Sequence, residues 1–422
     1  MIDPTTALDD AYRREWAFVL AATVRVAGDL DIAEECVQDA FVSALESWRQ
    51  RGVPDNPGAW LTTTARRRAI DVLRRDRTLR SKLPLLVEDE AVESDPTPGL
   101  EGKVVPDDRL RLVFTCCHPA LSPEAQTALT LRLVCGLTTA QIARAFLVQE
   151  TTMAARITRG KQKIRVARIP FSMPVEGELA ERLDAVLTVI HLFFTAGHTV
   201  ASCAELVDRD LVKRSIDLAR LLQQLLPDEP EVQGLLALLL LTDARSPARV
   251  DAAGRMLLLE EQDRSAWDRV KIEEGRSLVR AALRRRPPGR FALQSAIAAV
   301  HAEAPTYAET DWVEALGLYD TLLTVWPSPV VALNRAVAVA MVHGPEAGLA
   351  VVEGLSGDER LAHYLYLPAT RADLLRRMGR RDEAAESYRQ ALLLVDNGPE
   401  REFLQGRLED VTVSSGGRVA ES

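Results

Sequence analysis

Aromatic residues are scarce in this sequence and make up 5% of its 422 positions. Sheets favour aromatic and β-branched side chains, whereas the abundant Ala, Leu, Arg and Glu favour helices. The composition therefore predicts an all-α protein. A chain of this length corresponds to about three domains.

Cysteines are also few, and their number is odd: Cys36, Cys116, Cys117, Cys135 and Cys203. All lie in apolar, helix-like surroundings, so we expect reduced thiols in a cytoplasmic protein. Cys116, Cys117 and His118 are adjacent, which is poor spacing for chelating one ion, and no second Cys or His pair stands at zinc-finger spacing. We therefore predict no metal site and expect the thiols to pack in a core.

Long apolar runs and enzyme motifs are missing as well. The longest apolar run, residues 235–241, is far too short to span a bilayer, and no charged-then-apolar signal stands near the N-terminus, so no membrane partner is expected. We find no Ser-His-Asp arrangement, phosphate loop, paired-His metal motif or dinucleotide fingerprint. Residues 259–269 are polar enough to line a pocket but contain no visible nucleophile. The sequence predicts no enzyme, no catalytic residue and no cofactor.

Positive charge is in overall deficit, since the net charge is -9. DNA contact must therefore come from local basic patches. One such patch is a predicted helix-turn-helix, with helices at 139–146 and from 151 onward and Thr151 as N-cap. Met153, Ile157, Gly160 and Ile164 form its buried stripe. The residues expected to read duplex DNA are Thr151, Thr152, Arg156, Arg159, Lys161 and Lys163.

A further helix precedes this motif. Ser122, Pro123 and Glu124 form a strong helix start, and Gly136 is a good terminator. Three helices in close succession favour a compact DNA-reading domain. The alternative is a surface helix that is basic without binding DNA.

The N-terminal segment contains a helix with a continuous apolar stripe from Ala33 to Trp48 and Asp31 as expected N-cap. Its other side is expected to be exposed and carries Glu34, Glu35, Gln38 and Asp39. Without further context, these residues favour a solvated acidic face.

A turn-rich loop at 51–58 leads into a basic helix at 59–80. An aromatic residue beside dense positive charge is typical of single-stranded DNA binding, because bases stack on rings while cations follow the phosphates. The candidate residues are Trp60, Arg66, Arg67, Arg68, Arg74 and Arg75.

Residues from about 10 to 170 resemble an extracytoplasmic-function sigma factor, the smallest kind of bacterial sigma subunit. The resemblance is carried by Gly28-Asp29 with AEECVQDAFVSALESW, by PGAWLTTTARRRAIDVLRR and by LTTAQIARAF. The stretches DDRLRLVFTCCHPALS, LLALLLLTDAR, LEEQDRSAWD and PSPVVALNRAVAVA extend it to the group with a fused tetratricopeptide-like extension. This chain departs from many relatives at Arg67, where they carry Asn, and at residues 191–198.

The resemblance implies specific partners for each segment. Region two would dock on the beta-prime clamp helices of core RNA polymerase, with the beta subunit also in contact, through Glu34, Glu35, Gln38 and Asp39. Residues 51–60 would receive a flipped-out base of the minus-ten promoter element, and residues 66–75 would line the melted strand. The helix-turn-helix, region four, would read the minus-thirty-five element as duplex.

The C-terminal half reads as helix upon helix, including a helix expected at 248–259. Ala372, Leu375, Gly379, Ala384 and Tyr388 lie where a tetratricopeptide helix pair has its small and aromatic residues. Such arrays commonly bind a protein or peptide partner, although a domain that only braces the sigma core is the alternative. The expected domains are region two at 1–80, an acidic Pro-rich linker at 81–108, region four at 109–169, a helical extension at 170–290, repeats at 291–413 and a disordered tail at 414–422.

These features together predict a sigma factor that binds core RNA polymerase and promoter DNA, opens promoters and is modulated by its own C-terminal domain. The alternative is a helix-turn-helix regulator with a repeat adaptor that is no polymerase subunit. The basic helix at 59–80 favours the first, because a repressor needs only the helix-turn-helix.

Overall fold

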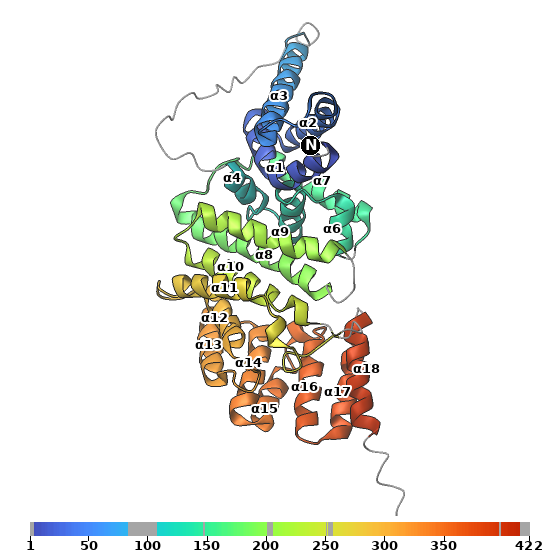
Figure 1. Cartoon of the computed structure of the whole chain (residues 1–422), viewed down its shortest axis with the longest axis vertical. Helices are drawn as coiled ribbons and strands as arrows, with labels where there is room; N and C mark the ends of the chain where they lie inside the picture. Colours follow the sequence, from blue (N-terminus) through green and yellow to red (C-terminus); the bar gives the residue numbers. More distant parts are fainter. Residues whose placement is uncertain are drawn as a thin grey trace, which may run out of the picture. The chain divides into compact units, whose positions relative to one another are not determined.

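All regular elements in the described part of the chain are helices, as Figure 1 shows. The computed structural model describes residues 4–82, 108–146, 148–200, 206–249, 251, 256–395 and 398–413. The all-α prediction is therefore confirmed. The chain divides into two compact units, Met1–Phe193 and Phe194–Ser422.

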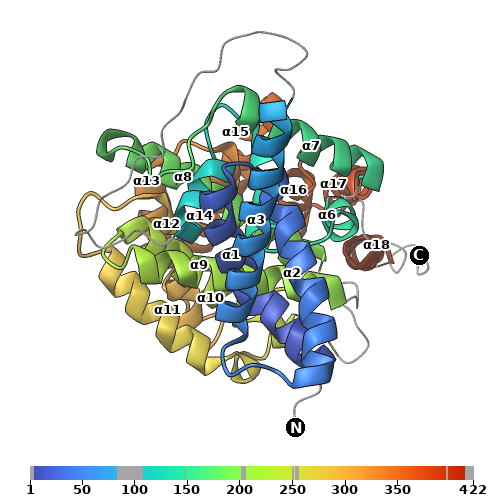
Figure 2. The same ribbon diagram turned by 90° about the horizontal axis from the view of Figure 1, so that it is seen from above.

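The first unit begins with three long helices, α1 (Pro4–Ala27), α2 (Leu30–Arg51) and α3 (Pro57–Lys82). α1 packs against both α2 and α3, and Figure 2 shows these helices in blue. Trp16 of α1 and Trp48 of α2 are fully buried, and the stripe from Ala33 to Trp48 is buried as predicted.

The start of α2 differs from the prediction. Asp29, not Asp31, is the N-cap, and its carboxylate accepts hydrogen bonds from the backbone N–H groups of Asp31 at 2.8 Å and Ile32 at 3.1 Å. Gly28 has a φ of 68°, which L-residues rarely adopt, and it turns the chain there. The helix therefore starts early enough to place Asp31 in its first turn.

The rest of the first unit consists of shorter helices: α4 (Asp108–Cys116), α5 (Pro123–Leu129), the π-helical turn η2 (Thr130–Val134), α6 (Thr139–Ala145), α7 (Glu150–Val166), the 3-10 turn η3 (Glu176–Glu178) and the start of α8 (Leu179–Val200). Ser122 caps α5 as predicted. The predicted cap at Thr151 is wrong: Gln149 keeps extended backbone angles, so α7 begins at Glu150.

The thiols of this unit pack in its core. Cys116 and Cys117 are fully buried, and the Cys117 sulfur lies 3.4 Å from the Thr130 hydroxyl. Burial raises the pKa of Cys117 to about 12, so the thiol stays neutral. Cys36 is also a buried free thiol. Cys203 lies outside the described residues.

The second unit contains the end of α8 followed by α9 (Leu206–Leu225), α10 (Pro230–Asp243), α11 (Arg269–Ala282), α12 (Arg290–Glu303), α13 (Trp312–Val325), α14 (Pro329–His343), α15 (Pro345–Leu355), α16 (Tyr366–Arg377), α17 (Arg381–Leu394) and α18 (Gly398–Val413). Three short 3-10 turns join them: η4 (Ser246–Ala248), η5 (Arg264–Ala266) and η6 (Glu359–Leu361). Consecutive helices from α9 to α18 pack on one another, and α10 contacts α12 as well as α11.

The helix predicted at 248–259 is wrong. Met256, Leu257, Leu258 and Leu259 are not helical, and the Leu257 N–H donates to the Arg249 carbonyl at 2.8 Å. Met256, Leu258 and Leu259 instead line a cavity among α13, α14, α16 and α18. Tertiary burial of these apolar side chains thus overrides their local helix propensity.

The predicted linker falls outside the described residues from 83 to 107, and so does the predicted tail at 414–422. Among the described helices, none combines the length and apolar character needed to cross a bilayer.

Candidate nucleic-acid interface

α7 presents a polar and basic face to solvent. Thr151, Thr152, Arg159 and Lys163 are exposed, and Arg156 is half-buried. The opposite stripe of Met153, Ile157, Gly160 and Ile164 is buried, as predicted.

Gly160 brings α7 close to α5. A Cβ atom at this position would lie 2.9 Å from Cδ1 of Leu129, nearer than side chains normally approach. Beside this contact is a cleft lined by Ser122, Glu124, Arg156, Arg159 and Lys163. The positive side chains of α7 thus stand next to the N-terminal end of α5, together with the Glu124 carboxylate.

Lys161 does not share this exposed face. Its ammonium group lies 2.5 Å from Glu34 and 2.9 Å from Asp31, and its side chain is only 12% exposed. Glu34 is also paired with Arg132 at 2.5 Å, and its side chain is 7% exposed. The expectation that Glu34 lies on an exposed side is therefore wrong, because segments from the second half of the unit cover it.

Arg165 reaches the same end of α2. It donates to Asp29 at 2.8 Å and to Asp31 at 2.5 Å. Burial tends to lower the pKa of Lys161, yet the carboxylates of Glu34 and Asp31 outweigh burial and raise it above its usual range. Lys161 therefore keeps its positive charge in this contact.

The remaining predicted docking residues are Glu35, Gln38 and Asp39, and all are exposed. Asp39 is paired with Arg68 of α3 at 2.5 Å, and Arg68 also donates to the Ser43 hydroxyl at 2.6 Å. A predicted docking residue and a predicted DNA-contacting residue thus bind each other and tie α2 to α3.

α3 carries the second basic face. Arg66, Arg67, Arg74 and Arg75 are exposed. Trp60 is half-buried, and its ring lies edge-to-face with that of Trp48 at a centroid distance of 5.8 Å. One part of the Trp60 ring thus rests on the core while the rest is open to solvent, an arrangement that holds an aromatic platform rigidly beside the arginines.

Sequence reasoning missed Arg132, Asp29, Tyr12 and Trp16 as contact residues. Arg132 stands alone between two buried leucines, and an isolated charge in an apolar run does indicate a buried partner. Tyr12 and Trp16 are one helical turn apart on α1, but nothing local to them indicates which surface they meet.

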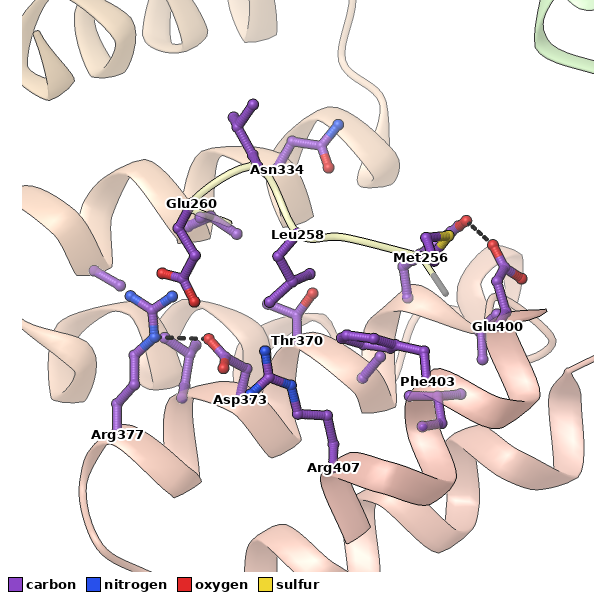
Figure 3. Close-up of a pocket in the computed structure, with 18 of the residues that line it drawn as sticks. Met256, Leu258, Glu260, Asn334, Thr370, Asp373, Arg377, Glu400, Phe403 and Arg407 are labelled. Atoms are coloured by element: carbon purple, nitrogen blue, oxygen red, sulfur yellow. Dashed lines mark hydrogen bonds and ion pairs between the residues drawn. The ribbon is translucent and has the colours of Figure 1, made fainter. Parts of the chain in front are cut away.

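A separate cavity of about 380 Å³ lies within the second unit, between α13, α14, α16 and α18 (Figure 3). Its walls are largely aromatic and aliphatic, and the segment from Met256 to Glu260 crosses it. Some of its charged groups are paired with one another or with a neighbouring hydroxyl: Arg377 binds Asp373 at 2.7 Å, and the Tyr366 hydroxyl donates to Glu400 at 2.6 Å. A protein or peptide partner for the C-terminal half stays a prediction.

Three known protein families match successive parts of this chain. Residues 11–78 match Sigma-70 region 2, residues 111–164 match Sigma-70, region 4, and residues 182–283 match a family of unknown function, DUF6596. α1 to α3 thus correspond to region 2, and α4 to α7 correspond to region 4.

An uncharacterized protein of Rhizobium meliloti (strain 1021) is 44% identical over 393 residues, which cover 92% of this chain and 92% of that protein. A probable ECF RNA polymerase sigma factor SigI of Mycobacterium tuberculosis is 28% identical over 174 residues, covering 40% of this chain and 58% of the relative. An ECF RNA polymerase sigma factor SigK of Mycobacterium sp. (strain KMS) is 29% identical over 165 residues, which cover 38% of this chain and 80% of that protein. The match to SigI thus spans less than two thirds of that protein. The chain belongs to the same family as the Rhizobium meliloti protein. In this chain, sigma-70 region 2 and region 4 domains precede the domain of unknown function.

Proposed function

We propose that this protein is a sigma factor that binds core RNA polymerase, recognises and opens promoters, and initiates transcription. The observation that carries the proposal is the order of the two sigma-70 domains, each with its own exposed basic helix face. A protein that only represses needs one DNA-reading helix, whereas a sigma factor needs one surface for melted DNA and another for duplex.

The roles divide between the domains. Region 2 docks on polymerase through the exposed residues Glu35, Gln38 and Asp39, joined by Glu34 once it is uncovered. Trp60 and the arginines of α3 hold the melted minus-ten strand by stacking and phosphate contact. The exposed face of α7 reads the minus-thirty-five duplex in the major groove.

The C-terminal half modulates this activity from within the same chain. Its proposed domains are the extension at 170–290 and the tetratricopeptide-like repeats at 291–413, which bind a protein or peptide partner. Support comes from its position, since α8 starts in the compact unit that holds region 4. The connection through Pro170 and Pro174 is short, so it gives the C-terminal helices a high effective concentration at the sigma domains.

Run-off transcription tests the central proposal. Purified chain and core RNA polymerase are incubated with genomic promoter fragments, and transcripts are sequenced from their 5′ ends. We expect discrete start sites that require this chain. If core polymerase alone gives the same starts, or if the chain fails to co-purify with core, the sigma-factor proposal is wrong.

Replacing Arg156 with Ala should weaken binding to the preferred duplex by about 1–3 kcal/mol, if its guanidinium pairs with a base edge. Replacing the more exposed Lys163 with Ala should weaken all sequences alike and reduce the salt slope by about one, because a phosphate contact carries no sequence information. Both effects are measured by titrating matched and scrambled duplexes at several salt concentrations. Identical profiles and slopes for the wild type and both variants would remove α7 from the duplex interface.

A further inference from the structure

The second unit contains a cavity that the sigma domains do not use. Its volume is about 380 Å³, which falls in the range of roughly 300–1,000 Å³ that is usual for small-molecule sites. α13, α14, α16 and α18 surround it, and the segment from Met256 to Glu260 crosses it (Figure 3). Its walls carry the aromatic side chains Tyr307, Trp312, Tyr319, Tyr366, Tyr388 and Phe403. Walls of this kind suit a ligand that itself contains a ring.

The rings of the cavity wall hold one another in place. The Trp312 ring lies edge-to-face with the ring of His301 at a centroid distance of 5.1 Å and with the ring of Tyr307 at 5.3 Å. Tyr388, on the α17 side, is only 2% exposed. Side chains that are already fixed lose little conformational entropy when a ligand binds, so this wall is preorganised.

The charged groups at the cavity are engaged in ion pairs. Arg377 binds Asp373 at 2.7 Å, and Arg407 binds Glu261 at 2.8 Å, which ties α18 to the segment that crosses the cavity. Glu260 is exposed, and its charge, with that of Asp373, outweighs burial and raises the pKa of Arg377. A charged ligand would have to compete for one member of a pair and leave the other poorly compensated. The pairing therefore favours an uncharged ligand.

Other ionisable groups of the wall stay neutral. Burial, together with the nearby Arg245 and Arg264, lowers the pKa of His301 to about 4. Burial raises the pKa of Tyr319 to about 12. The imidazole and the phenol are thus both uncharged at neutral pH, in keeping with a ligand that carries no charge.

Neutral hydrogen-bonding groups complete the site. In the part of the chain that the structure describes, neither the Thr370 hydroxyl nor the Asn334 amide has a hydrogen-bond partner, and both line the cavity (Figure 3). The Nδ1 atom of His301 and the Nε1 atom of Trp312 are buried without a partner among the described residues. Buried polar atoms without partners cost stability, so this region is not optimised for stability alone.

We propose that this cavity is a binding site for a small, uncharged aromatic molecule with a hydrogen-bond donor. The ring of the ligand packs on the aromatic walls, and the donor bonds the Thr370 hydroxyl. Access requires movement of the segment from Met256 to Glu260. The site belongs to the second unit alone, so the inference does not depend on the sigma-factor proposal. It is also distinct from the protein or peptide partner proposed for the C-terminal half.

Indole is a suitable probe, because it is an uncharged ring system with one N–H donor. Tryptamine and indole-3-acetate carry the same ring with a positive and a negative charge. Binding to the purified full chain is measured by isothermal titration calorimetry and by saturation-transfer difference NMR. We expect one indole per chain, and both charged derivatives should bind more weakly by about tenfold or more, because each disturbs an ion pair of the wall.

A cavity-filling variant tests the location. Ala369 of α16 lines the cavity, and Ala369→Phe should weaken indole binding about tenfold or more, because the new ring occupies the same space. Ala350→Phe adds the same ring at an exposed position of α15 and should bind indole as the wild type does. Circular dichroism shows that each variant is folded.

A volume-conserving variant tests the hydrogen bond without filling the cavity. Thr370→Val removes the hydroxyl and should weaken indole binding about two- to tenfold, the value of one hydrogen bond. N-methylindole has no N–H donor, so its affinity should be the same for the wild type and Thr370→Val. Thr321→Val makes the same change at an exposed position of α13 and should leave indole binding unchanged.

Three results would overturn the inference. Without saturable indole binding by the full chain, or with equal indole affinity in the wild type and Ala369→Phe, the cavity is not the site. Tryptamine or indole-3-acetate bound as tightly as indole would show that the ligand class is wrong. An equal loss of indole and N-methylindole binding in Thr370→Val would remove the hydrogen bond. Run-off transcription is measured separately, so none of these results bears on the sigma-factor proposal.

Discussion

Changing Arg74 and Arg75 together to Glu is expected to abolish promoter melting while binding to core polymerase stays at the wild-type level. Both side chains are exposed on α3, beyond the part of that helix that Arg68 ties to α2. The change turns two cations into two anions along the proposed path of the melted strand. The strand would lose phosphate contacts and meet repulsion, and single-strand binding depends steeply on such charges.

Permanganate reactivity of unpaired thymines measures the melting, and co-purification measures core binding. The matched control is Arg13→Glu with Arg14→Glu, an adjacent pair of exposed arginines on α1 that is outside the proposed DNA face. It makes the same charge change in the same domain and should leave melting unaffected. If the α3 variant still melts promoters, the strand lies elsewhere on region 2.

A chain that ends at Ile169 is expected to lose transcription activity. The compact first unit continues to Phe193, and this cut removes the part of α8 that belongs to it. Leu183, Val186, Ile190 and Phe193 of α8 are buried, and burial of each such side chain contributes about 1.5–3 kcal/mol. Leu192 lines a cleft with Phe146 and Met153 of the helix-turn-helix, so the cut also opens region 4 to solvent.

A second cut after Val200 keeps all of α8 and serves as the comparison. If the chain that ends at Ile169 is inactive and the chain that ends at Val200 is active, α8 stabilises the active sigma domains. If both chains are inactive, the helices that follow α8 are needed for this stabilisation. Circular dichroism and thermal unfolding show whether each fragment is folded, so that loss of function can be told from loss of fold. Equal activity of residues 1–169 and the full chain would show that the extension does not modulate the sigma domains.

Local sequence signals predicted much of the fold because their physics is local. Ser122 before Pro123 supplies a cap and a fixed backbone angle within one turn, so the start of α5 is independent of distant residues. The stripe from Met153 to Ile164 follows from helical periodicity alone. The same reasoning failed at 248–259, where Met256 and Leu258 find their apolar surroundings on helices far along the chain.

The sequence by itself determined that the chain is helical, that its first half carries two DNA-reading segments in the order of sigma-70 domains, and which residues share a helix face. Only the tertiary structure decided which of those residues are free to act. Lys161 and Lys163 belong to one basic run, yet Lys163 is exposed and Lys161 is held by Glu34 and Asp31. Periodicity gives the angle of a side chain around its own helix, whereas the surface that covers it comes from packing between residues more than 120 positions apart.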